Sequence, residues 1–424
     1  MRRLRSALFL FVLMAAPGIS SAKALPVETL DWNQCLTETA AHHPDLQSAA
    51  QSVFQAQAQR DIVKGGLLPS VSASLGGDRS VSNIRAPIGS WSYGLNASQL
   101  LFDGAKTCNL VNAASESIKA SRYSMNKVSS STRLALRTAF VQLMTAQRQV
   151  ALAAEIAEKR RQNLRLIGLL YQSGTENIGS KSKANADLAA AEFEVAQAKR
   201  GLELAQVVLS TELGRENFRP IRASGQFVAS EQTGKLPDFD TIVHENPVYL
   251  NLVAQKESSR FNLLAAGSAF MPTVSVSSGM GNSSFSQLPP DRTDWQVGVN
   301  VAVPIFQGGS GKATVAKARS VLNQLSYDEK SIFFSLMRSL QLAWKNFIDA
   351  SDYVVVQKKY LDAATERARI ADAQYSSGLV TFNEWTIIED NLVNAKKSFL
   401  NAQSNLLITE ANWIQAKGGT LETR

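Results

Sequence analysis

The side chains that most often perform catalysis or bind metals are few and scattered in this chain of 424 residues. Its three histidines are His42, His43 and His244. His42 and His43 stand beside Pro44, with no partner at the spacing of a zinc site. The sequence also contains neither a glycine-rich phosphate-binding loop nor a nucleophile elbow. We therefore predict no catalytic residue, no cofactor and no metal site.

The only two cysteines are Cys35 and Cys108. Cys35 precedes the first predicted strand by some 34 residues, and Cys108 directly follows the second. A helix of about 30 residues in between would hold them roughly 40 Å apart, which is too far for a disulfide. We predict that each is a buried thiol.

The N-terminus has the features of a secretory signal peptide. Three arginines among the first five residues precede a short apolar run, and small residues follow it up to Ala24. The run is too short to span a bilayer, and no cysteine stands at the cleavage site for lipid attachment. Removal of residues 1–24 would lower the formal net charge from +8 to +4. This ordinary balance gives no reason to expect nucleic acid as a partner.

The sequence repeats itself at a spacing of 203 to 204 residues. The segment WSYGLNASQLLFDG at 91–104 returns as WQVGVNVAVPIFQG at 295–308, and YQSG at 171–174 returns as YSSG at 375–378. Such a constant offset indicates an internal duplication, with each repeat made of a helix, a β-hairpin and long helices. The predicted parts are the signal peptide (1–24), a first repeat (25–214, hairpin 69–102), an irregular connector (215–240) and a second repeat (241–424, hairpin 272–306).

Long helices make up most of each repeat. Residues 105–171 and 312–375 contain no proline and are rich in good helix formers. About 65 helical residues would form a rod of roughly 100 Å, unless the helix is broken. Apolar residues at alternating steps of three and four predict coiled-coil packing, which holds helices together whatever the function. The predicted seams are Leu188, Ala191, Val195, Ala198, Leu202, Ala205 and Leu209; Leu392, Ala395, Phe399, Ala402, Leu406, Thr409 and Trp413; Leu136, Phe140, Leu143 and Val150; and Leu340, Trp344, Phe347 and Val354.

Four segments alternate apolar with small, uncharged polar residues, as β-strands with two different faces do. These segments are residues 69–77, 91–102, 273–280 and 295–306. Each is about as long as a transmembrane strand, which needs roughly 9–11 residues. Trp91 and Trp295 begin two of them and Phe102 and Phe306 end them, as aromatic residues at two membrane interfaces would.

Either protein or lipid can cover the apolar faces, because alternation alone also fits a soluble sheet packed on the helices. The export signal, the polar starts of the following helices and the long polar loops near 78–90 and 281–294 favour lipid. Four strands cannot close a barrel, and an open sheet edge in hydrocarbon is costly. Several copies must then share one barrel: two would give eight strands with a filled interior, and three would give twelve with a passage.

The ordered set of motifs resembles the TolC-type outer-membrane efflux proteins. The matching segments are LLPSVSAS and FMPTVSVS, YGLNASQLLFDGAK and VGVNVAVPIFQGG, and YQSG and YSSG. The resemblance implies a mostly α fold with a small β part, in which four transmembrane strands per chain complete a twelve-stranded barrel in a homotrimer, above a long coiled-coil helical barrel. It also implies an outer-membrane location that extends into the periplasm, docking to an inner-membrane transporter through a periplasmic adaptor protein, and passive export without enzymatic chemistry.

The resemblance also places the helical tips and adaptor contacts at the YxxG segments, with Tyr171, Gly174, Tyr375 and Gly378 as candidates. Opposite charges on neighbouring tips would hold the entrance closed, and a ring of three carboxylates would attract cations. The alternative is that these are solvated helix charges of little energetic consequence. The gate candidates are Glu384, which matches an acidic position of the family, Ile387, which stands where a second acid is expected, Glu389, Asp390, Lys181 and Lys183.

Two other functions fit part of the pattern. A periplasmic coiled-coil adaptor without its own barrel is the first, although the duplication argues against a protein with a single hairpin. A fibrous or adhesive coiled coil is the second. The sequence does not specify whether the cargo is a drug, a metal ion or, as in type I secretion, a protein.

Overall fold

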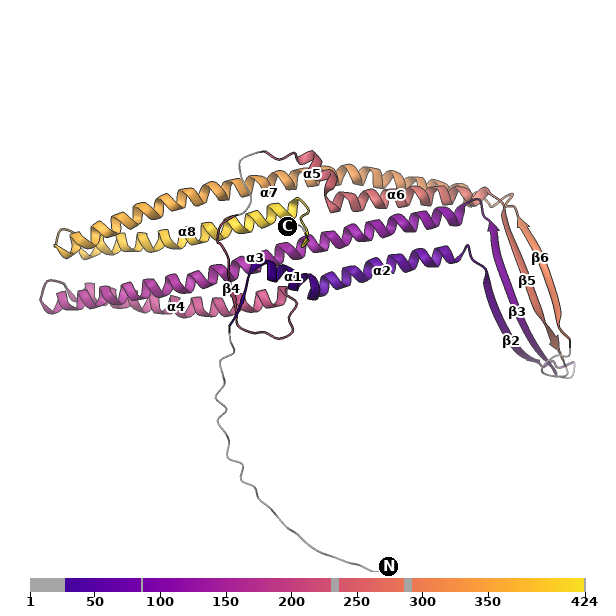
Figure 1. Ribbon diagram of the computed structural model, residues 1–424, viewed down its shortest axis with the longest axis horizontal. Helices are drawn as coiled ribbons and strands as arrows, with labels where there is room; N and C mark the ends of the chain where they lie inside the picture. The colour runs from indigo at the N-terminus through magenta and orange to yellow at the C-terminus, as the bar shows by residue number, and fades with distance from the viewer. Residues whose placement is uncertain (1–26, 85–86, 230–235, 286–291, 423–424) are drawn as a thin grey trace, which may run out of the picture.

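The computed structural model describes residues 27–84, 87–229, 236–285 and 292–422. The predicted signal peptide lies outside these ranges. Figure 1 shows an elongated molecule in which long helices run side by side from a small β-sheet at one end to helical tips at the other. None of the helices in the described ranges is both long and apolar enough to cross a membrane.

Helices form most of the described chain. The two longest, α3 (Lys106–Gln172) and α7 (Ser310–Ser376), have 67 residues each and no break. At 1.5 Å per residue each is about 100 Å long, as the proline-free runs predict. The other helices are α1 (Trp32–His42), α2 (Pro44–Gly65), α4 (Ile178–Glu212), α5 (Phe239–Glu245), α6 (Pro247–Gly267), the 3₁₀ turn η1 (Ser268–Phe270) and α8 (Phe382–Ala416).

The predicted coiled-coil seams are confirmed, because every seam residue is buried or half-buried and none is exposed. On α4 the seam faces α3, and on α8 it faces α7, so each long helix and the helix after it form a hairpin. Leu136, Phe140 and Leu209 pack in one core cluster at mid-rod, and Leu340 and Trp413 pack in a second.

The connector is more ordered than the sequence predicts. Its strand β4 (Ile221–Ala223) pairs in parallel with β1 (Glu28–Leu30). The guanidinium of Arg215 donates to carboxylate oxygens of Glu28 and Glu38, each at 2.7 Å. The prediction of an irregular 215–240 segment is therefore wrong for β4 and for the start of α5, because a three-residue strand is too short to show an alternating pattern.

The end of α4 is packed tightly against the first helices. Gly214 has a φ of +76°, and a Cβ there would lie 2.7 Å from the carbonyl oxygen of His42. The conformation favours glycine, and the neighbouring backbone leaves no space for a side chain.

An antiparallel sheet caps the other end of the rods. Its strands are β2 (Ser70–Ser80), β3 (Ile88–Phe102), β5 (Thr273–Ser284) and β6 (Asp294–Ala302), paired in the order β2-β3-β5-β6. The register gives the sheet two unlike faces. One cross-strand row contains Ala73, Leu95, Met280 and Trp295, and the adjacent row, on the other face, contains Ser72, Asn96, Gly279 and Gln296.

The strand ends differ from the predicted ones. The strand predicted at 295–306 stops at Ala302, because Pro304 has no backbone N–H to continue the ladder, so Phe306 lies beyond the strand. β2, β3 and β5 extend further than predicted, which shortens the loops. A bulge between Leu100 and Phe102 turns Phe102 onto the apolar face, where it pairs with Val274.

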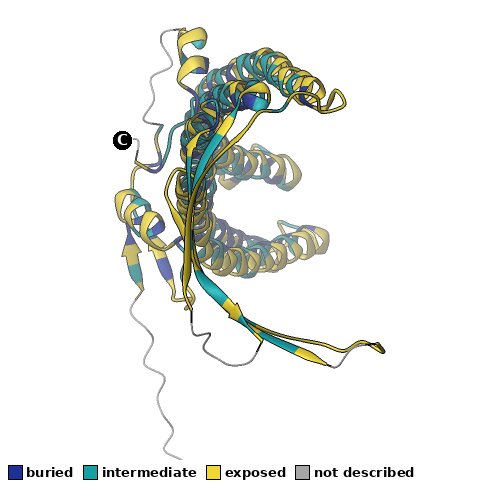
Figure 2. Ribbon diagram, turned by 90° about the vertical axis from the view of Figure 1, so that its right-hand side faces the viewer, coloured by how far each residue is buried: buried dark blue, intermediate teal, exposed yellow. Residues whose placement is uncertain are grey.

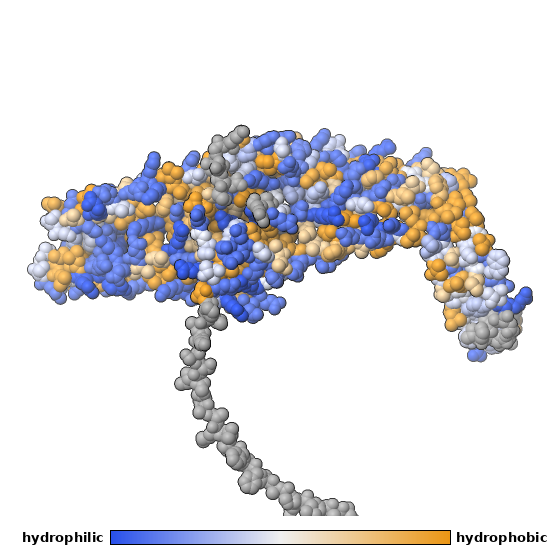
Figure 3. Space-filling model, viewed as in Figure 1, coloured by the Kyte–Doolittle hydropathy of each residue, from blue (hydrophilic) through white to orange (hydrophobic). Residues whose placement is uncertain are grey.

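The helices and the sheet together form a curved layer, which we call the wall of the molecule. Figure 2, seen from the sheet end, shows the helices arranged along an arc and the sheet following it, with one side open. β2 and β6 are the two edge strands of the sheet, and every residue of β6 is exposed in the isolated chain. Figure 3 shows hydrophobic surface gathered where the helices meet the sheet and continuing onto the strands.

Both cysteines are free, and Cys35 is buried as predicted. Cys108 is exposed, so the prediction of a buried thiol is wrong there. It lies in the first turn of α3, where the rod emerges from the sheet and less of its surface is covered.

Candidate functional site at the helical tips

The two YxxG segments form the turns at the tips, at the left-hand end of Figure 1. Gly174 and Gly378 have φ values of +78° and +76°, and a Cβ on either would meet no atom within 4 Å. Glycine is favoured here by backbone conformation alone. The turn between α3 and α4 and the turn between α7 and α8 therefore have the same backbone geometry, and their side chains distinguish them.

Tyr375 joins the two hairpins. Its ring stacks on Trp385, with centroids 4.5 Å apart and planes 5° apart, and its hydroxyl donates to Glu176 Oε1 of the other tip at 2.9 Å. Burial and the Glu176 carboxylate raise the pKa of Tyr375, so the hydroxyl keeps its proton at neutral pH. Its counterpart Tyr171 is exposed, and its ring lies under the ammonium of Lys181 at 5.1 Å.

The gate candidates at the start of α8 have local partners. Glu384 forms a capping box with Thr381, whose backbone N–H and hydroxyl lower the pKa of the carboxyl. Ile387 is exposed. In the first repeat, Lys183 forms an ion pair with Asp187 on its own helix. Among the described residues, neither Lys181 nor Lys183 forms an ion pair with Glu384 of the other tip, and the gate hypothesis remains a prediction.

One turn further along α8, charges bridge the two hairpins. Asp390 is bonded to Arg160 of α3, and Glu389 is 3% exposed. Asp372 of α7 accepts from the indole N–H of Trp385 at 2.7 Å and from Lys159 Nζ of α3 at 2.8 Å. The structure thus adds residues that the sequence pattern did not indicate: Glu176, Trp385, Asp372, Lys159 and Arg160. Of these residues, only Trp385 could have been noticed in the sequence, because a large aromatic residue directly follows Glu384 at the start of a helix.

The four candidate interface aromatics lie at the two ends of the sheet. Trp91 and Trp295 lie near the loops, and the register places both on the apolar face. Phe102 and Phe306 lie near the helices, and Phe306 is 88% exposed.

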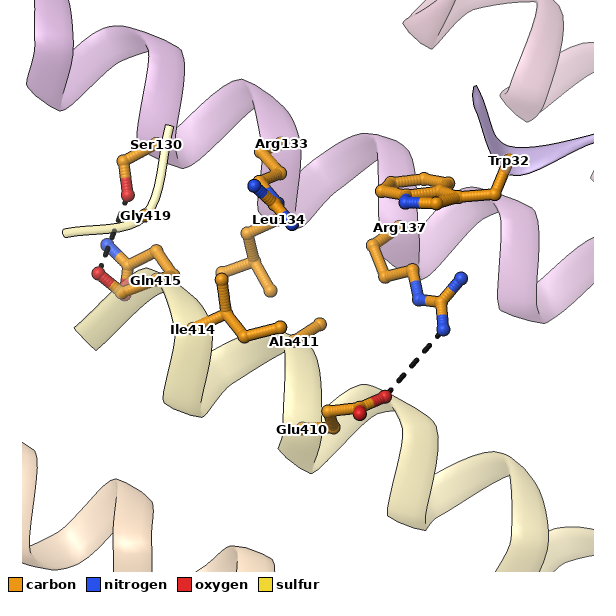
Figure 4. A pocket seen from close by; sticks show the side chains of 10 residues that line it. All are labelled: Trp32, Ser130, Arg133, Leu134, Arg137, Glu410, Ala411, Ile414, Gln415 and Gly419. Carbon is orange, nitrogen blue, oxygen red and sulfur yellow. Dashed lines mark hydrogen bonds and ion pairs between the residues drawn. The ribbon is translucent and has the colours of Figure 1, made fainter. Parts of the chain in front are cut away.

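A cavity of about 190 Å³ lies at mid-rod, between α3 and α8 (Figure 4). Arg137 reaches across it to Glu410, with the nearest atoms 3.7 Å apart, and its guanidinium lies 4.8 Å from the centre of the Trp32 ring. Burial lowers the pKa of Arg137. Nearby, Arg133 Nη1 donates to the Thr420 carbonyl at 2.6 Å. These contacts fix the C-terminal segment to α3. In the described part of the chain, no three His, Cys, Asp or Glu side chains are grouped so as to hold a metal ion.

The comparisons with known proteins agree on one family. A model of the family described as outer membrane efflux protein matches residues 35–215 and 242–419. The "Probable outer membrane lipoprotein SilC" of Salmonella typhimurium is 23% identical over 410 residues, which cover 91% of this chain and 85% of that protein. The "Cation efflux system protein CusC" of Escherichia coli (strain K12) is 23% identical over 403 residues, with the same two coverages.

Solved structures of this kind share the fold. A crystal structure of CusC superposes with a TM-score of 0.82 at 21% identity and covers 91% of each chain. The Campylobacter jejuni CmeC outer membrane channel superposes with a TM-score of 0.80 at 19% identity and covers 92% of this chain and 86% of its own.

Proposed function

The chain belongs to the outer membrane efflux protein family, and from that membership we propose that it is the passive exit duct of a tripartite export system. It is an outer-membrane channel that extends into the periplasm. The family match covers both halves of the chain, which favours the channel over the adaptor alternative.

The main observation behind the proposal is that the four-stranded sheet is open, with two edge strands and an exposed apolar face. Its apolar face carries Val297 and Val299, which are 63% and 67% exposed. Its edge strands β2 and β6 have no outer neighbouring strand among the described residues of the isolated chain. In a bilayer such edges would leave backbone groups unpaired, at a cost of several kcal/mol each. β6 of one copy would therefore pair with β2 of the next. Three copies give twelve strands, and the serines, glycines and asparagines of the other face suit an open lumen.

The helices support the rest of the assembly. α3 and α7 have equal lengths, as do α4 and α8 with 35 residues each, which supports the internal duplication. Three curved walls of this kind would enclose a periplasmic tunnel. Its tips, around Tyr171, Gly174, Tyr375 and Gly378, would contact a periplasmic adaptor that links the duct to an inner-membrane transporter. Glu384 and Ile387, with Glu389, Asp390, Lys181 and Lys183 nearby, would set the size and charge of the entrance.

The relatives do not agree on a cargo, since their names refer to cation efflux, pyoverdine export and toluene efflux. We therefore propose that the duct accepts what its pump delivers. No catalytic step is assigned to it.

The mature chain, purified in detergent and added to planar lipid bilayers, tests this proposal. We expect discrete conductance steps and a trimer by cross-linking. Val299→Arg changes only the proposed lipid face, and it should reduce insertion into the bilayer. A water-soluble monomer without detergent, or bilayers without steps, would overturn the proposal.

A further inference from the structure

A second cavity, of about 420 Å³, lies between α3 and the α7–α8 hairpin, in the half of the rods nearer the tips. Its size is within the range of 300–1,000 Å³ that is typical of small-molecule sites. One part of the lining is apolar and comes from all three helices: Ile156, Ala368, Leu392 and Val393. The remainder consists mainly of charged side chains.

Most of these charges are neutralised in pairs. Lys396 Nζ of α8 lies 2.5 Å from Glu155 of α3, and Lys159 lies 2.8 Å from Asp372. Each pair crosses from α3 to the α7–α8 hairpin. The other lining charges also have partners: Arg160 with Asp390, Glu158 with Arg161, and Arg369 with Glu366.

Glu389 is the exception among the described lining charges. It is 3% exposed and lines the cavity, yet no hydrogen bond or ion pair within the described residues involves its carboxyl group. Burial raises the pKa of Glu389, and the Asp372 carboxylate adds to this, although Lys159, Arg160 and Lys396 act against it at longer range. A buried carboxyl without a partner is costly and is expected to take up a proton or a cation.

We propose that this cavity binds a small organic cation with an apolar body, and that the Glu389 carboxylate pairs with its charge. The apolar lining would cover the body of the ligand, while Glu389 supplies the one lining carboxylate that forms no ion pair or hydrogen bond among the described residues. A divalent metal ion fits less well, because it needs several oxygen ligands and the neighbouring carboxylates of Asp372 and Glu155 are already bound to lysines. This inference goes beyond the duct function and does not depend on it.

Ethidium is a suitable probe, since it has a permanent positive charge and an aromatic body. Its binding to the full mature chain in detergent is measured by fluorescence polarisation, with the neutral N-phenyl-1-naphthylamine as the comparison probe. Glu389→Gln keeps the side-chain shape and removes the charge. We expect it to weaken ethidium binding roughly tenfold or more, as the loss of one charge-assisted contact would, and to leave binding of the neutral probe unchanged.

Two further variants make the test decisive. Glu203→Gln removes an exposed acidic charge from α4, outside the cavity, and should leave ethidium binding unchanged. Ala368→Phe fills the cavity and keeps Glu389, so it should abolish ethidium binding. Unchanged ethidium affinity in Glu389→Gln or in Ala368→Phe would overturn the proposal. An equal loss in Glu203→Gln would also overturn it, because the attraction would then be a general effect of net charge.

Discussion

The hydroxyl of Tyr375 is the most direct link between the two helical tips, and Tyr375→Phe removes it alone. The Phe ring keeps the stacking position on Trp385, so the change isolates the hydrogen bond to Glu176. A hydrogen bond to a charged group contributes about 1.5–3 kcal/mol. Because Glu176 is half-exposed, solvent screening reduces this to about 1–1.5 kcal/mol.

Loss of the hydrogen bond between Tyr375 and Glu176 should have a measurable effect on how often the two tips separate. A change of about 1.4 kcal/mol is tenfold in an equilibrium constant. Loss of the bond should therefore shift the balance between joined and separated tips about tenfold in each chain, and on the order of a thousandfold if three chains open together. Single-channel recording of the reconstituted duct should show a larger fraction of time in its highest conductance state.

Tyr171→Phe is the matched control, because Tyr171 occupies the same place in the other YxxG segment and its hydroxyl has no hydrogen bond in the described structure. Its conductance should equal that of the unmodified chain. If Tyr375→Phe also leaves the conductance unchanged, or if both variants raise it equally, the hydroxyl of Tyr375 does not hold the tips together.

Three further predictions concern other parts of the molecule. Val299→Arg on the apolar sheet face should raise the free energy of membrane insertion by about 2–4 kcal/mol if that face meets lipid, so less chain should reach the outer-membrane fraction. Gln296→Arg on the opposite face should insert normally. Equal amounts of the two variants in the outer-membrane fraction would show that the apolar face does not meet lipid. Gly214→Ala should lower the melting temperature by several degrees, because strain at positive φ costs about 1–3 kcal/mol and the new Cβ meets backbone; an unchanged melting temperature would contradict the tight packing. In the folded chain a maleimide should label Cys108 and spare Cys35, since burial raises the pKa of Cys35 to about 12; labelling of Cys35 at neutral pH without unfolding would refute its burial.

The rods and turns could be predicted because their signals are local. A proline-free run of good helix formers, interrupted only at YxxG, leaves few alternatives to a long helical hairpin with glycine in its turn. The coiled-coil seams follow in the same way from steps of three and four. The short strand β4 could not be predicted, because its pairing with β1 depends on a contact between segments some 190 residues apart.

For the tips, the sequence predicted the correct region of the chain but not the side-chain contacts within it. Tyr171 and Tyr375 stand in the same motif, yet one is exposed and the other is bonded to a residue 199 positions away. In the sequence, Glu384 and Glu389 are both acidic residues near the start of a helix. In the structure, Glu384 caps the helix, whereas Glu389 is buried beside a cavity. Such differences depend on which helix packs against each face, and no periodic pattern contains that information.

By itself, the sequence predicted an internal duplication, and it determined that long coiled-coil helices form most of the chain and that its strands have one apolar and one small polar face. These properties depend on residue type and spacing within single segments. The tertiary structure alone decided which strands are neighbours, that a bulge turns Phe102 onto the apolar face, and which charges bridge the hairpins. The physical reason is that burial and pairing are fixed only when distant segments come together, so that the same side chain becomes a surface charge in one place and a buried partner in another.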